Sequence, residues 1–110
     1  MGKEEAKVQT HILNFLNWLK AFVFKTIASS KGGIPDVISC VPMTKTQVDK
    51  WFDTHETIGL FVAIEVKKPG GKPSHLQLVQ LRKIREAGGL GFVADNLDEV
   101  KDQLNHLMES

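Results

Sequence analysis

Residues 59–71 read GLFVAIEVKKPGG, an apolar, β-branched run that ends in charge and then in a glycine turn. Such a run predicts a strand over 60–68, because Val, Ile and Phe are favoured on a pleated surface. Side chains alternate across a strand, so Glu65 and Lys67 share one face with Phe61. An amphipathic strand whose charged end meets water explains this pattern by itself, and a functional cluster is the alternative.

The segments before this strand predict one helix, two strands and an insertion. Apolar side chains at three- and four-residue spacing predict a helix that extends to Leu19. Two short β-branched runs predict strands over 21–27 and 36–41. A Thr-x-x-Gln capping box that begins at Thr44 predicts a short helix inside an insertion at 43–58.

The segments after the strand predict a helix, a strand and a second helix. PGGKP at 69–73 turns the chain, and a helix follows from Ser74 and ends before Gly88. A short strand is predicted at 92–94, and Asn96 opens the last helix as an N-cap. The inner face of this last helix is expected to consist of Leu97, Val100, Leu104 and Leu107.

The predicted order is helix, strand, strand, insertion, strand, helix, strand, helix, which indicates an α/β fold with a mixed sheet flanked by helices. Three sequential strands form most simply an antiparallel meander, and the helical connection to the last strand allows a parallel crossover. With 110 residues and 42% hydrophobic content, the chain is expected to form one domain, 1–110.

Composition gives weaker indications of partners and location. The formal net charge of +1 favours neither a strongly basic nucleic-acid coat protein nor an acidic tail protein. Residues 61–85 nevertheless carry six basic side chains against one acid, which fits an anion-binding face or an ordinary solvated surface. A lone Cys40 in an apolar strand indicates a buried thiol. We therefore expect a soluble intracellular protein without a membrane segment, from a bacterial cytoplasm or a phage-infected host cell.

A second carboxylate points to metal chemistry. Asp36 begins the strand that follows GGIP, and it can approach Glu65 if the strands over 36–41 and 60–68 pair. Two like charges in contact repel unless something neutralises them. Mg²⁺ prefers carboxylate oxygens and keeps waters, and it stabilises the charge that develops on a phosphoryl group. Lys67 is placed to orient a water or to neutralise the transition state.

The motifs in this order resemble the virus-type replication-repair nuclease family, VRR-NUC, of the PD-(D/E)xK nuclease superfamily. The resemblance is carried by EAKVQ at 5–9, GIPDVIS at 33–39, FVAIEVKKPGGKPSHLQ at 61–77 and GG at 88–89. It implies a restriction-endonuclease-like core and an endonuclease that uses Mg²⁺ or Mn²⁺. Small standalone members resemble Holliday-junction resolvases, which implies a homodimer that cuts branched or four-way-junction DNA. A monomeric flap or single-strand nuclease and a non-catalytic DNA-binding module are the alternatives.

The resemblance also implies roles for individual residues. Its catalytic and metal-binding positions fall on Asp36, Glu65, the backbone carbonyl of Val66, Lys67, Gln77 and Glu5. Gln77 has a second explanation, because it stands three residues after Ser74 and completes a capping box. Glu5 also has one, because the helix dipole favours acids in a first turn.

Basic and hydroxyl side chains near these positions are candidates for contacts with DNA phosphates. They are Lys31, Lys68, Lys72 and Ser30, with Ser29 as a neighbour. Ordinary solvation of loops explains any one of these lysines equally well. The chain has no GxxxxGK[ST] loop, so no nucleotide cofactor is expected, and one cysteine with four scattered histidines does not indicate a zinc site.

Overall fold

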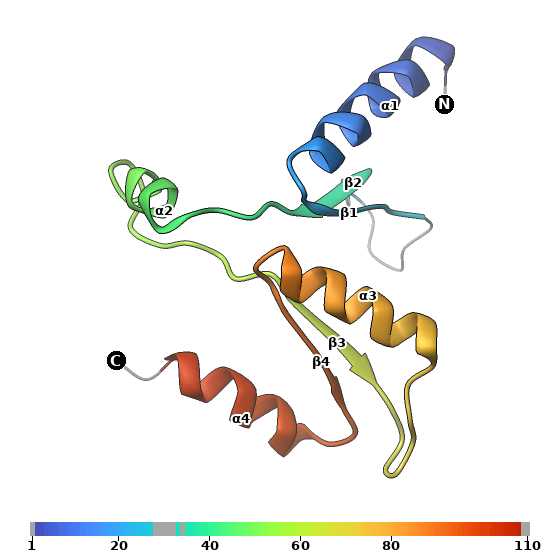
Figure 1. The fold of residues 1–110 in the computed structure, drawn as a ribbon, viewed down its shortest axis with the longest axis vertical. Coiled ribbons are helices and arrows are strands. Elements are labelled where there is room, and N and C mark those ends of the chain that lie inside the picture. The colour runs from blue at the N-terminus through green and yellow to red at the C-terminus, as the bar shows by residue number, and fades with distance from the viewer. Residues whose placement is uncertain (1, 28–32, 34, 109–110) are drawn as a thin grey trace.

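The computed structural model describes residues 2–27, 33 and 35–108, and this part of the chain is α/β, with four helices and four strands (Figure 1). In chain order the elements are α1 (Lys3–Trp18), β1 (Phe22–Lys25), β2 (Val37–Cys40), α2 (Lys45–Trp51), β3 (Val62–Val66), α3 (His75–Glu86), β4 (Leu90–Ala94) and α4 (Leu97–Met108). This is the order predicted from the sequence. The strand starts differ by at most two residues, because β3 begins at Val62 rather than at residue 60 and β4 at Leu90 rather than at residue 92.

The four strands form two separate two-stranded sheets (Figure 1). β1 pairs antiparallel with β2, and β3 pairs parallel with β4, so the predicted crossover through α3 is confirmed. The predicted three-stranded meander is wrong, because β2 and β3 belong to different sheets. A meander relies on short turns that fix the register, whereas β2 and β3 are joined by a long excursion through α2.

The interior of the fold lies mainly between α3 and the parallel sheet. Leu81 and Ile84 are the buried side chains of α3, and they lie over the face of the sheet that carries Ala63. Gly91 allows this close packing, because a Cβ at that position would lie 3.1 Å from the carbonyl oxygen of Leu81. The helix therefore lies almost directly on the backbone of β4.

α4 lies on the other side of the parallel sheet from α3 (Figure 1). Val100 and Leu104 are half-buried, but Leu97 and Leu107 are 65% and 54% exposed, so the predicted inner face is only half correct. The two-stranded sheet is too narrow to cover the whole apolar face of α4. The ends of that face consequently remain in contact with solvent.

The two sheets meet at one end of β2 and β3. The ring of Phe22 lies edge-on to Phe61, with 6.2 Å between centroids, and the thiol of Cys40 donates to the carbonyl oxygen of Ala87 at 3.5 Å. Cys40 is buried, as expected, and burial raises the pKa of its thiol. Beyond this joint the sheets diverge (Figure 1). The radius of gyration is 16.4 Å, against roughly 13 Å for a compact domain of this length.

α1 and α2 contribute little to the interior. α1 has no buried residue, and its apolar stripe of Val8, Ile12 and Phe15 is exposed by 57%, 44% and 57%. α2 begins with the predicted capping box, in which Thr44 accepts from the amide of Gln47 and the Gln47 side chain accepts from the amide of Thr44. Within the described ranges, no helix has the length and apolar character needed to cross a membrane.

Candidate active site

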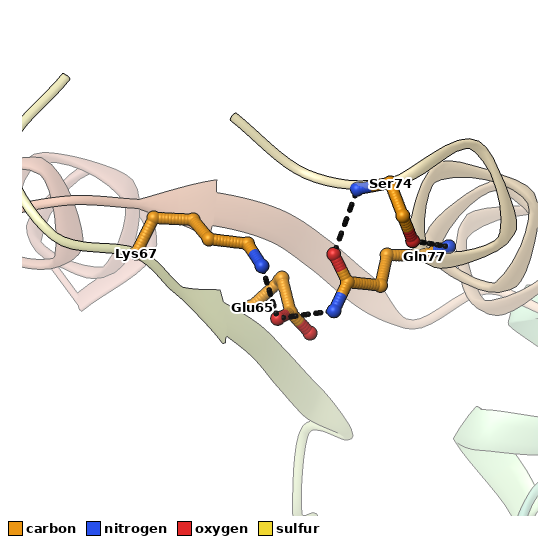
Figure 2. A network of polar contacts seen from close by, with 4 residues as sticks. All are labelled: Glu65, Lys67, Ser74 and Gln77. Carbon is orange, nitrogen blue, oxygen red and sulfur yellow. Dashed lines mark hydrogen bonds and ion pairs between the residues drawn. The ribbon is translucent and has the colours of Figure 1, made fainter. Parts of the chain in front are cut away.

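The predicted charged cluster forms around one oxygen of Glu65. Its Oε1 atom lies 3.3 Å from Nζ of Lys67 and accepts a hydrogen bond of 2.8 Å from Nε2 of Gln77 (Figure 2). The side chains of Lys67 and Glu65 are 23% and 30% exposed, so the pair is partly withdrawn from water. The shared strand face predicted for Glu65 and Lys67 is thereby confirmed, and α3 adds the third member.

Gln77 completes the predicted capping box and also contacts Glu65. Its side-chain Oε1 accepts from the backbone amide of Ser74 at 2.8 Å, and its backbone amide donates to Oγ of Ser74 at 3.1 Å (Figure 2). These two hydrogen bonds complete the capping box of α3. Because the side-chain carbonyl oxygen of Gln77 accepts a hydrogen bond in the capping box, the NH₂ group of the same side chain points toward Glu65. The start of α3 therefore orients the carboxylate on β3.

Asp36 lies on the other sheet. It is exposed and directly precedes β2, and its carbonyl oxygen accepts from the amide of Thr26 at 2.9 Å. Oγ1 of Thr26 donates to the carbonyl oxygen of Pro35 at 2.7 Å, so β1 holds the Pro-Asp dipeptide through its backbone. The expected approach of Asp36 to Glu65 depended on pairing between β2 and β3, and this pairing is not formed.

The VRR-NUC domain model matches residues 3–96, which is most of the chain and includes the Glu65 cluster and Asp36. The chain belongs to the VRR-NUC family. The VRR-NUC domain is a nuclease domain, so this protein is a nuclease of a family that acts on DNA. No curated protein and no solved structure matches the chain significantly.

The donor chemistry of this VRR-NUC site fits a hard divalent cation. Both polar contacts of Glu65 go to Oε1, and within the described part of the chain Oε2 accepts no hydrogen bond. A cavity of about 290 Å³ is lined by Glu65, Gln77 and Gln80 and otherwise by apolar side chains such as Leu76 and Leu81. Mg²⁺ binds through one or two carboxylates together with waters and phosphate, so a single oriented carboxylate provides a partial site. No group of three or more His, Cys, Asp or Glu residues gathers among the residues that the structure describes.

The other predicted positions lie next to Glu65 in the chain, on the turn at 68–72, on α1 or outside the described residues. Val66 ends β3 and is 74% exposed, directly after Glu65. Glu5 lies exposed in the first turn of α1 and forms no ion pair or side-chain hydrogen bond among the described residues. Lys68 and Lys72 are exposed at the two ends of the PGG turn. Ser29, Ser30 and Lys31 lie outside the described residues.

One residue at the edge of this VRR-NUC site escaped the sequence analysis. Oδ2 of Asp95 accepts from the amide of Gly70 at 3.1 Å, and its Oδ1 accepts from Nδ2 of Asn96 at 2.8 Å. The Gly70 amide and the Asn96 amide lower the pKa of Asp95. Asp95 thus ties the turn between Lys68 and Lys72 to the end of β4. The sequence did offer one clue to this role. Asp95 directly follows β4, and the carboxyl ends of parallel strands lie at the same edge of a sheet, here the edge at which β3 ends.

Proposed function

We propose that this VRR-NUC domain is a divalent-metal-dependent endonuclease that hydrolyses phosphodiester bonds in branched DNA, with Mg²⁺ or Mn²⁺ as cofactor. The observation that carries the proposal is the Glu65–Lys67–Gln77 cluster, in which one carboxylate oxygen is held by two donors and the other accepts no hydrogen bond from the described residues. A pure DNA-binding module has no need of a carboxylate fixed beside a polyanion.

The residues of the chain divide the work between them. Glu65 would hold the metal through Oε2, with the backbone carbonyl of Val66 as a further ligand, and the carboxylate of Asp36 would join them only where β2 comes to lie beside β3. The metal, when bound, would supply a more acidic water and charge stabilisation at the phosphoryl group. Lys67 places its ammonium beside Glu65, where it stabilises negative charge that develops on the phosphate. Gln77 keeps the carboxylate in its orientation.

The proposal includes a homodimer, because two strands of a four-way junction are related by a two-fold axis and one chain carries one site. Two exposed apolar surfaces support self-association. One is the α1 stripe of Val8, Ile12 and Phe15. The other is at the start of α3, where Leu76 and Leu78 are 65% and 47% exposed. Burial of such apolar area is the main driving force for subunit association.

Cleavage of a labelled four-way junction, with and without Mg²⁺ or Mn²⁺, tests this proposal. Asp36→Ala and Lys67→Ala are each expected to slow cleavage at least about 10²-fold. Asp53→Ala is the matched control for Asp36→Ala, because it removes a carboxylate just after α2. Lys101→Ala is the matched control for Lys67→Ala, because it removes an ammonium group from α4. Binding of the junction is expected to survive Asp36→Ala, because removing an acid near phosphates reduces repulsion. Cleavage by both site variants at the parental rate would refute the site assignment.

The substrate and the oligomeric state need separate measurements. A panel of junction, flap, single-stranded and duplex DNA under identical conditions is expected to show fastest cleavage of the junction. Light scattering at micromolar protein concentration is expected to give the mass of a dimer. A monomer that prefers flaps or single strands would replace the junction assignment with the monomeric nuclease, while leaving the roles of Glu65 and Lys67 intact.

A further inference from the structure

A second cavity, with a more polar lining, lies along α3 on the side of the Glu65 site that faces α1. It has a volume of about 550 Å³ and is bounded by the last turn of α1, the start of β1 and the later turns of α3. Its lining includes the polar side chains of Lys20, Lys83, Asn17 and Gln80. The only carboxylate in its lining is Glu86, which forms an ion pair of 3.9 Å with Arg82.

This cavity offers two uncompensated ammonium groups. Neither Lys20 nor Lys83 forms an ion pair among the residues that the structure describes. The amides of Asn17 and Gln80 add hydrogen-bond donors to the same lining. Two cations with neutral amide donors are suited to an anion such as a phosphate, and unsuited to a cation or an apolar ligand.

The backbone of Lys20 gives an independent observation at this position. Lys20 has a φ of 65°, and it is the only residue other than glycine with a positive φ in the described part of the chain. The amide of Ala21 donates to the carbonyl oxygen of Leu16, and the amide of Lys20 donates to that of Asn17, which is the Schellman arrangement at a helix end. Glycine is the usual residue at this position, because a Cβ is strained there. A lysine at this strained position points to a use for its side chain.

The cavity adjoins the one that Glu65 lines. Gln80 lines both the cavity of Glu65 and the cavity that contains Lys20 and Lys83. Gln77 and Lys83 are six residues apart on α3, a distance of about 9 Å along the helix axis. A DNA strand carries one phosphate per nucleotide, so a strand that is cut at Glu65 can place a nearby phosphate at Lys83.

We infer that Lys20 and Lys83 form a phosphate subsite that holds the DNA backbone a few nucleotides from the scissile bond. The inference rests on the proposed nuclease function, because it takes Glu65 as the centre of cleavage. It assigns to the end of α1 a direct contact with substrate, whereas the lysines expected from the sequence all lie on the turn at 68–72 or at residue 31. The subsite contacts phosphate and therefore positions DNA without reading its sequence.

Lys20→Gly separates a binding role from a structural role. Glycine removes the charge and also the backbone strain, so the variant is expected to melt at or above the temperature of the parent. Its affinity for a four-way junction, measured by fluorescence anisotropy without divalent metal so that the DNA stays intact, is expected to fall roughly fivefold at low salt. The slope of log K against log salt is expected to become shallower by about 0.9.

Two further variants complete the test. Lys83→Ala is expected to show the same loss of affinity and slope, and Lys101→Ala, which removes an equal charge from α4, is expected to leave both unchanged. If Lys20→Gly and Lys83→Ala both bind like Lys101→Ala while the parent binds and cuts DNA, the subsite is refuted and the nuclease function stands. If Lys20→Gly is less stable than the parent, Lys83→Ala alone decides, and an unchanged affinity refutes the subsite. A parent that does not bind DNA overturns both proposals.

Discussion

The two halves of this molecule are organised differently. From β3 to α4 the chain forms a packed unit, in which α3 covers the parallel sheet with Leu81 and Ile84. From α1 to β2 it forms an antiparallel strand pair and a helix with no buried residue. The packed half brings Glu65 together with its two partners, whereas Asp36 lies in the open half.

This difference follows from how far apart the site residues lie in the sequence. Glu65 and Lys67 are neighbours on one strand face, and Gln77 follows after a single turn. Asp36 can reach Glu65 only if two strands pair across the long segment that contains α2. Closing such a segment costs more conformational entropy, and it leaves the strand register free.

The largest contrast in stability is expected between the core residues of the two halves. Leu81 is 5% exposed, and Leu81→Ala is expected to lower the free energy of unfolding by about 3 kcal/mol, from lost burial and a residual cavity. Ile12 is 44% exposed on α1, and Ile12→Ala is expected to cost less than about 1 kcal/mol in the monomer. Urea unfolding monitored by circular dichroism measures both. Equal losses in dilute protein would contradict the contrast, and a cost for Ile12→Ala that grows with protein concentration would indicate a subunit contact.

A smaller effect is expected at the joint between the halves. A Cβ on Gly89 would lie 2.9 Å from Cγ2 of Ile84 and 3.2 Å from Sγ of Cys40, so Gly89→Ala is expected to destabilise the fold by about 1–3 kcal/mol. Gly59→Ala is the matched control, because a Cβ there meets nothing within 4 Å. Thermal unfolding of both variants measures the difference. A Gly89→Ala variant as stable as the parent would show that β2 does not pack closely against the end of α3.

The sequence predicted those features that depend on local chemistry. Two capping boxes, begun by Thr44 and Ser74, were predicted from spacing and are both formed. The element order and the parallel crossover were predicted from periodicity and from the length of α3. The shared face of Glu65 and Lys67 followed from strand alternation alone.

The features that were not predicted depend on contacts between distant segments. Asp95 binds the amide of Gly70 across 25 residues, and nothing in the local pattern around Asp95 distinguishes it from other acids near a helix start. The partition of the strands into two sheets likewise depends on where the long α2 segment leads the chain. The apolar spacing of α4 did not reveal how little of it two strands can cover.

The two capping boxes provide a matched test of the active-site half. Gln77→Ala and Gln47→Ala each remove the N3 half of a capping box and leave the Ser or Thr cap in place, so each is expected to cost less than about 1 kcal/mol of stability. Only Gln77 also orients Glu65, so Gln77→Ala alone is expected to slow junction cleavage, by about tenfold. Cleavage rates at saturating and limiting Mg²⁺ are the measurement, since a displaced carboxylate should raise the metal concentration required. Equal cleavage by the two variants would mean that Gln77 serves α3 only.

The smallest expected effect concerns the turn that joins the Glu65 strand to α3. Because hydrogen bonds from Gly70 and Asn96 lower the pKa of Asp95, its ionised form stabilises the fold above the ordinary carboxyl pKa of about 3.9. That contribution is lost as the pH falls through the lowered pKa of the folded state. Asp95→Asn is therefore expected to melt a few degrees below the parent near neutral pH, and the difference should shrink as the pH falls below the ordinary carboxyl pKa of about 3.9. Asp53→Asn is the matched control, because it removes an equal charge whose side chain makes no hydrogen bond among the described residues. A deficit of Asp95→Asn that does not shrink as the pH falls below about 3.9 would mean that the shape of the side chain, rather than its charge, holds the turn against β4.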